Sequence, residues 1–225
     1  MMLILALLAA LQDAAPAAPP PPPVQPGIVV TGAAGCGPPY ARVYIAPMGQ
    51  PFRTDGQTDP MRAWFAQADA DHDGRLTLAE FVADSDRFFT TLDRDRSGEI
   101  DPEEMAIYEN QVAPEIKLYQ RGQDKRPRTG KQKREAKAAA RQRADYEAPY
   151  GAGIYASLNI PEPVVSADLD LNRGVSRPEL AEVAARRFPL LDPSGQGTLT
   201  YDTLPRSPAQ KDIDACRAQA DKKKR

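Results

Sequence analysis

The chain has 225 residues, with 29 basic and 31 acidic side chains and a formal net charge of -2. A single histidine and two cysteines leave no Ser/His/Asp or Cys/His catalytic set and no C-x-x-C zinc or redox motif. Composition therefore argues against the common hydrolases and zinc proteins.

The N-terminus has the pattern of an export signal. Residues 3–11 form an apolar run too short to span a bilayer comfortably, and small residues suited to cleavage follow between Ala14 and Ala17. No Lys or Arg precedes the run, so an uncleaved membrane anchor is the alternative interpretation. We expect a signal peptide at residues 1–17 and a periplasmic or secreted bacterial protein.

Residues 18–57 predict a Pro/Gly-rich linker and a lead-in to the folded part. The unbroken run from Pro19 to Pro23 favours an extended polyproline II spacer within a disordered, Pro-rich N-terminus. A short β-like run follows at residues 41–45, so we expect the lead-in to be partly ordered.

Residues 58–113 predict a pair of helix-loop-helix units. Asp59 and Pro60 signal a helix start, and apolar residues follow at helical spacing. Residues 69–80 then place an oxygen donor at each position that a twelve-residue calcium loop requires, with Gly74 at its sharp turn. The predicted ligands are Asp69, Asp71, Asp73, the carbonyl of Arg75, Thr77 and Glu80.

A second loop with the same pattern occupies residues 93–104. Its predicted ligands are Asp93, Asp95, Ser97, the carbonyl of Glu99, Asp101 and Glu104, with Gly98 at the turn. These two loops resemble those of the EF-hand family, and the resemblance implies Ca²⁺ binding and an all-α fold. Solvated acidic loops are the alternative.

The spacing of the two loops predicts an unusual arrangement. Residues 81–92 are too few for an exiting helix, a turn and an entering helix, so we expect one shared helix. That helix would place the two loops roughly 20 Å apart at its ends. Loop pairing would then occur between the two halves of the chain.

Residues 114–160 predict a basic helical linker. Residues 117–143 contain eleven Lys or Arg residues, opposed only by Asp124 and Glu135. One interpretation is a solvated helix over residues 131–146, which are rich in helix formers. The other is adhesion to an anionic surface such as membrane phosphates or acidic polysaccharide. Export argues against DNA, so we expect no nucleic acid partner.

Residues 161–204 predict a second pair of loops, because Asp168 and Asp192 repeat the spacing of Asp69 and Asp93. The third loop offers Asp168, Asp170, Asn172, the carbonyl of Gly174, Ser176 and Glu179. Arg173 stands at its glycine position, so we expect weaker binding there. The fourth loop, residues 192–203, ends in Thr203 instead of a carboxylate. We expect this degenerate loop to be empty and to pack against a partner loop.

The flanks of the second half are less regular. Residues 160–165 leave room for about one helical turn before the third loop. Pro189 should kink or end the following helix near its C-terminus. In the C-terminal segment 205–225, Ser207 and Pro208 start a helix over residues 208–220. For Cys36 and Cys216, one disulfide and two unpaired thiols remain alternatives.

Residues 44–53 and 158–163 also resemble stretches of exported bacterial EF-hand proteins without an established role. The resemblance covers most of residues 40–204 and implies calcium binding only. We predict a non-catalytic calcium sensor, buffer or calcium-stabilised adapter, with calcium ions and an unidentified protein or envelope component as partners. The alternative is an envelope protein that binds an anionic surface through residues 117–143, with calcium purely structural. Membrane contact would involve only that segment or an uncleaved N-terminus.

Stripping calcium from the mature protein is expected to loosen the helices around Trp64, because a metal site that is absent from the unfolded chain contributes to folding. Trp64 fluorescence and circular dichroism, recorded in chelator and again after calcium addition, measure this effect. Spectra that stay the same through the cycle would contradict it.

Overall fold

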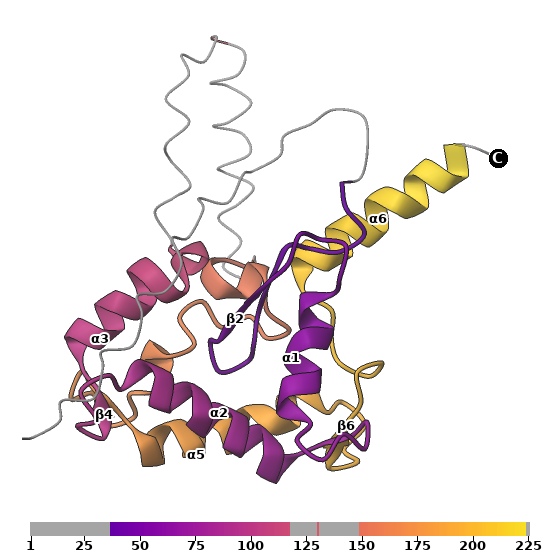
Figure 1. Ribbon diagram of the computed structural model, residues 1–225. Coiled ribbons are helices and arrows are strands. Elements are labelled where there is room, and N and C mark those ends of the chain that lie inside the picture. Colours follow the sequence, from indigo (N-terminus) through magenta and orange to yellow (C-terminus); the bar gives the residue numbers. More distant parts are fainter. Residues whose placement is uncertain (1–36, 118–129, 131–148, 224–225) are drawn as a thin grey trace, which may run out of the picture.

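The computed structural model of the protein describes residues 37–117, Gly130 and residues 149–223 (Figure 1). The predicted signal peptide, the proline spacer and most of the basic segment 117–143 lie outside these residues. The described part contains five α-helices and six strands of two or three residues, so it is mainly helical. None of its helices combines the length and apolar character needed to cross a membrane.

A short β-hairpin precedes the first helix. Strand β1 (Val43–Ile45) pairs antiparallel with β2 (Pro51–Arg53), and both contact helix α1 (Pro60–Ala68). Tyr44 and Ile45 of β1 are buried in the core. The sequence predicted the first strand only, because a three-residue run that begins with proline shows no alternating pattern.

Helix α1 begins and packs as the sequence predicted. Asp59 caps it, with Oδ1 accepting a hydrogen bond from the Met61 amide at 2.9 Å. The Trp64 indole is fully buried and donates to Asp84 Oδ2 at 3.0 Å. The four apolar residues expected from their spacing are buried together with Pro60, namely Met61, Trp64, Phe65 and Ala68.

A single helix, α2 (Leu78–Leu92), joins the first loop to the second, which confirms the predicted shared helix. It begins at a capping box formed by Thr77 and Glu80. Helix α3 (Pro102–Ile107) follows the second loop, begins at the same kind of box and continues into a π-helical turn, η1 (Tyr108–Val112). The helix starts therefore recur in register with the loops.

The second half repeats this arrangement with a shorter entry. One 3-10 turn, η5 (Val165–Ala167), precedes the third loop, as the limited space predicted. Helix α5 (Arg177–Leu191) continues through Pro189 and ends two residues later, where the Asp192 amide donates to the Pro189 carbonyl at 3.2 Å. Helix α6 (Pro208–Lys223) extends slightly beyond its predicted span.

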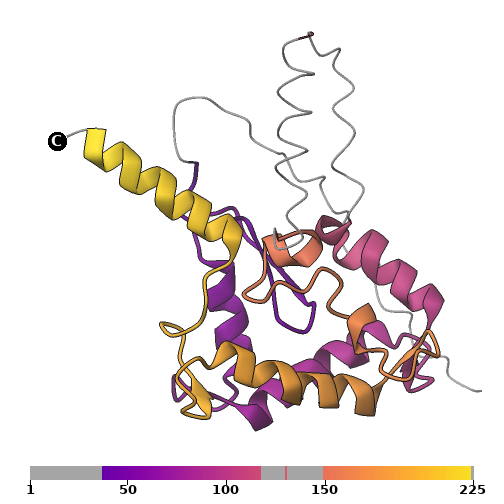
Figure 2. The same ribbon diagram turned by 180° about the vertical axis from the view of Figure 1, so that it is seen from behind.

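The loops pair between the two halves of the chain. Strand β3 (Leu76–Thr77) of loop one pairs antiparallel with β6 (Thr198–Leu199) of loop four. Strand β4 (Glu99–Ile100) of loop two pairs with β5 (Val175–Ser176) of loop three. Helices α2 and α5 consequently lie side by side in opposite directions, as both views show (Figure 1 and Figure 2). This confirms the predicted pairing between the halves.

Both halves contribute to one hydrophobic core. Phe81 of α2 and Phe188 of α5 meet with their ring centroids 5.7 Å apart. Arg187 of α5 is also buried, and its guanidinium donates to the carbonyls of Pro47 and Pro163 at 2.8 Å each. One residue of each two-residue loop strand is completely buried, namely Leu76, Ile100, Val175 and Leu199.

The start of α6 is tied to the lead-in. The Gln210 side chain accepts from the Ala41 amide at 2.8 Å and donates to the Pro39 carbonyl at 3.3 Å. Cys216, further along α6, is disulfide-bonded, which excludes an unpaired thiol at this position. The other cysteine of the chain, Cys36, lies outside the described residues.

Leu76→Ala is expected to lower the free energy of unfolding by about 2–5 kcal/mol, because it empties a fully buried position between loops one and four. Leu78→Ala is the matched control, since that side chain is 42% exposed, and it should cost less than about 1 kcal/mol. Denaturant unfolding followed by Trp64 fluorescence at fixed calcium measures both. Equal effects would contradict the burial of Leu76 against Leu199.

Candidate metal centres

The four predicted loops share one backbone conformation. In each of them the fourth and sixth residues have a positive φ, between 59° and 88°. The residues are His72 and Gly74, Arg96 and Gly98, Leu171 and Arg173, and Gly195 and Gly197. The left-handed region favours glycine, so Arg173 holds the strained conformation that the sequence predicted for it. The four segments, which align in sequence, therefore also turn at the same two positions in the structure.

The first aspartate of loops one and two uses one oxygen within the loop and leaves the other without a partner. Asp69 Oδ2 accepts from the Gly74 amide at 3.0 Å, and Asp93 Oδ2 accepts from the Gly98 amide at 3.1 Å. Both aspartates are buried, and the Oδ1 of each is a buried atom without a hydrogen bond. Such an oxygen is costly unless a cation or water satisfies it.

Further carboxylates gather around these two aspartates. Oxygens within 4.8 Å of one another form two groups, Asp69, Asp71 and Asp73 in loop one, and Asp93, Asp95 and Glu104 in loop two. Negative charges at this separation repel one another, so each group favours a bound cation. All of the grouped donors are oxygens, which suits a hard divalent ion.

The glutamate that ends each of the first three loops closes its loop in the same way. Glu80 accepts with Oε1 from the amides of the second and third loop residues, and with Oε2 from the Thr77 amide at 2.9 Å. Glu104 and Glu179 repeat this pattern. The hydrogen bonds from Thr77 and Ser176 lower the pKa of Glu80 and Glu179, respectively. Both carboxylates are therefore ionised at neutral pH.

The remaining predicted ligands lie near the ends of loops one and two, where the strands and helices begin. Arg75 directly precedes β3, and Glu99 begins β4, so each carbonyl lies where its loop enters the paired strand. Ser97 Oγ donates to the Glu99 carbonyl at 3.0 Å. At the ninth position, Thr77 and Asp101 both serve as helix caps.

Loop three brings its predicted ligands together, but its first aspartate is satisfied within the loop. Asp168 Oδ1 accepts from the Asn172 amide at 3.1 Å, and Oδ2 accepts from the Arg173 amide at 2.9 Å. Asn172 Oδ1 in turn accepts from the Gly174 amide at 2.7 Å. The third group of carboxylates within 4.8 Å comprises Asp168, Asp170 and Glu179.

The Glu99 side chain of loop two lies against Gly174 of loop three. A Cβ atom added to this glycine would lie 1.7 Å from Glu99 Oε1, so a side chain there would displace the Glu99 carboxylate. This contact comes from the β4–β5 pairing and was not predicted, because it joins residues far apart in the sequence.

Loop four uses its first aspartate for internal hydrogen bonds. Asp192 Oδ1 accepts from Ser194 Oγ at 2.6 Å, and Oδ2 accepts from the Gly197 amide at 2.7 Å. Thr203, at the twelfth position, accepts with its hydroxyl from the Thr200 amide at 3.1 Å. The Thr203 hydroxyl thus bonds only to the ninth residue of its loop, Thr200. The glutamates of the other three loops also accept hydrogen bonds from the second and third loop residues.

One further buried oxygen without a hydrogen bond lies outside the loops, on Glu162. Burial, followed by the nearby charge of Glu109, raises the pKa of Glu162 to about 7. Glu162 is therefore partly protonated at neutral pH, unlike a metal-binding carboxylate. Its sequence context gives no sign of this environment, which depends on packing around η1.

A comparison with known families identifies the first two loops. The family model described as EF hand matches residues 61–83 and 86–106, which include both of these loops and most of α1, α2 and α3. No curated protein and no solved structure matches the chain. EF-hand domains bind calcium through the loop between two helices. The comparison therefore supports two consecutive EF hands, at residues 61–83 and 86–106.

Proposed function

We propose that loops one and two each bind one Ca²⁺ ion and that the protein is a non-catalytic calcium-binding protein. The observation that supports this most directly is the buried Oδ1 of Asp69 and of Asp93, which has no hydrogen-bond partner. Each lies in a loop whose carboxylates crowd within 4.8 Å. A cation would both satisfy the unpartnered oxygen and relieve the repulsion.

The donor set favours calcium over other common metals. Carboxylates, together with the carbonyls of Arg75 and Glu99, provide enough oxygens for the six to eight ligands that calcium takes. Magnesium demands a near-ideal octahedron and retains several waters. Zinc would favour histidine or cysteine, and the one histidine of the chain, His72, is exposed at the fourth position of loop one.

Glu80 and Glu104 would supply the carboxylate at the twelfth position of their loops. Each already joins the start of the loop to its end through backbone amides. The same glutamate side chain therefore provides both the negative charge for the ion and the hydrogen bonds that close the loop. Exchange of this side chain for an amide would remove the charge while retaining much of the shape.

Loop three is the proposed weaker site, and loop four is not proposed to bind. Asp168 already accepts hydrogen bonds with both oxygens, so an ion must compete with these bonds. Arg173 adds a positive charge and a strained φ of 79°. Loop four has Thr203 in place of the closing carboxylate, and Asp192 is satisfied within its loop.

The proposed location is outside the cytoplasm, as a periplasmic or secreted protein. Two features support it, namely the apolar run at residues 3–11 and the disulfide at Cys216. Disulfides persist mainly in oxidising compartments. Calcium is abundant there, so affinities of about 10⁻⁴ to 10⁻³ M suffice for occupancy. In this setting, calcium would stabilise the fold of a module that acts as a sensor, a buffer or an adapter.

Isothermal calorimetry of the mature protein is expected to find two stronger sites and one weaker site. Glu80→Gln and Glu104→Gln should each weaken one stronger site by roughly tenfold or more, because a negative ligand charge is lost. Glu182→Gln makes the same exchange at an exposed glutamate of α5 outside the loops and is the matched control, which should leave all sites intact. A Glu179→Gln variant with an unchanged binding isotherm would remove loop three from the proposal.

Arg173→Gly is expected to strengthen the weaker site by about three- to tenfold, because glycine relieves the positive φ and the cation is removed. Arg173→Gln separates the two effects, since it removes the charge and keeps the strained backbone. Its gain should be the smaller one. Calorimetry in a Glu80→Gln/Glu104→Gln background isolates this site, and an unchanged affinity for both variants would contradict the account of loop three.

A further inference from the structure

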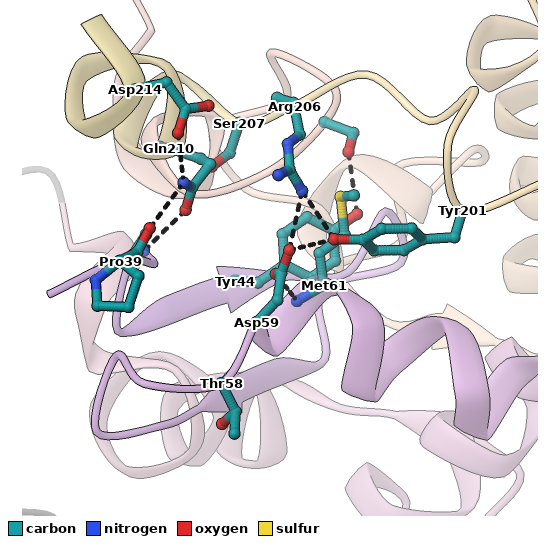
Figure 3. Close-up of polar contacts among 12 residues, drawn as sticks. Pro39, Tyr44, Thr58, Asp59, Met61, Tyr201, Arg206, Ser207, Gln210 and Asp214 are labelled. Carbon is teal, nitrogen blue, oxygen red and sulfur yellow. Dashed lines mark hydrogen bonds and ion pairs between the residues drawn. The ribbon is translucent and has the colours of Figure 1, made fainter. Parts of the chain in front are cut away.

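Asp59, at the start of α1, connects the first hand to the end of loop four and the segment that follows it. In addition to capping α1, it accepts with Oδ2 from Arg206 Nη1 at 2.8 Å and from the Tyr201 hydroxyl. Figure 3 shows the three side chains converging, and Arg206 Nη1 also donates to the Tyr201 oxygen at 2.9 Å. The Asp59 side chain is 5% exposed, so water screens the pair only weakly.

The ring of Tyr201 packs against the same helix. The Arg62 guanidinium lies 3.8 Å from the ring centroid, and Phe65 meets the ring edge-on at 6.3 Å. Burial, followed by the hydrogen bond to Asp59, raises the pKa of Tyr201, so its hydroxyl remains a donor at neutral pH. Tyr201 and Arg206 therefore contact α1 at its cap and over its first two turns. We call these contacts the brace.

Tyr201 and Arg206, which form one side of the brace, lie in and just after loop four, the loop with the poorest metal-binding pattern. Tyr201 follows β6 of loop four, and Arg206 lies just before α6. Loop four thus contacts the first hand twice, through β6 against β3 inside loop one and through the brace at the start of the entering helix. The cavity beside Asp59 and Arg206 measures about 10 Å³, room for about one water, so the contact holds no organic ligand.

We propose that Tyr201 and Arg206 are positioning residues for the calcium site of loop one, and that the end of loop four and the segment after it keep this site competent to bind. The inference rests on the proposed function of loop one. In this account, loop four contributes to calcium binding without holding an ion itself.

The physical reason lies in the balance of forces on α1. The helix has nine residues, fewer than a helix needs to be stable by itself. Without calcium, repulsion among Asp69, Asp71 and Asp73 opposes the closed loop at its C-terminal end. The brace holds the opposite end of α1. Because apparent affinity scales with the fraction of molecules in the competent conformation, loss of the brace should weaken binding at loop one.

The test uses two versions of the full mature chain. In Glu104→Gln/Glu179→Gln the remaining strong site is loop one, and in Glu80→Gln/Glu179→Gln it is loop two. Asp59→Asn retains a cap for α1 but removes the charge, and Tyr201→Phe retains the ring but removes the hydroxyl. We expect each to weaken calcium binding at loop one by about five- to tenfold and at loop two by less than about twofold. Arg206→Lys, which keeps the charge, should show a smaller loss.

Asp86→Asn is the matched control, because it breaks the exposed Arg177–Asp86 ion pair between α2 and α5 and leaves the brace intact. It should change neither affinity, and circular dichroism should show that all variants remain folded. Equal weakening at both loops, or unchanged binding at loop one, would overturn the inference alone. Absence of calcium binding by the loop-one protein with an intact brace would overturn the proposed function, and the inference with it.

Discussion

The shared helix α2 determines which loops can pair, because loops one and two lie at its opposite ends. It has fifteen residues, so it holds loops one and two about 22 Å apart. At that distance the two loops cannot pair with each other, and their inward residues, Leu76 and Ile100, need partners elsewhere. Helix α5 has the same length and runs in the opposite direction. Helix α5 therefore places loop three beside loop two and loop four beside loop one.

This constraint produces two unequal loop pairs. Loop one, with an unpartnered buried oxygen on Asp69, pairs with loop four, where Asp192 is satisfied internally. Loop two, with the same feature on Asp93, pairs with loop three, where Asp168 has no free oxygen. Each of the two loops with an unpartnered aspartate oxygen is thus paired with a loop whose first aspartate is fully hydrogen-bonded. Because the two sites lie farther apart than the screening length of about 8–10 Å, filling one adds little repulsion at the other.

Much of this arrangement could be predicted from sequence because it depends on local rules. Asp59 and the capping boxes mark helix starts by hydrogen bonds within a few residues, and the short interval between loops leaves room for one helix only. Loop pairing between the halves followed from that interval, whereas the choice of partner for each loop was not predicted. These features need no knowledge of distant residues, so residue spacing was sufficient to predict them.

Features that depend on long-range contacts could not be predicted in this way. The buried cation of Arg187 donates to the Pro47 carbonyl, 140 residues away, and its sequence neighbours resemble an ordinary helix surface. The contact of Glu99 with Gly174 and the convergence of Tyr201 and Arg206 on Asp59 arise only once the halves have paired. The unpartnered oxygens of Asp69 and Asp93 likewise became visible only with the geometry of the closed loop.

The loops pair between the halves, one with four and two with three. The most direct measurement is a nuclear Overhauser spectrum of the isotope-labelled, calcium-loaded protein, which detects protons within about 5 Å across an antiparallel strand pair. Cross-strand signals between Leu76 and Leu199 and between Ile100 and Val175 are expected. Signals between Leu76 and Ile100, and between Val175 and Leu199, would show pairing within each half and contradict pairing between the halves.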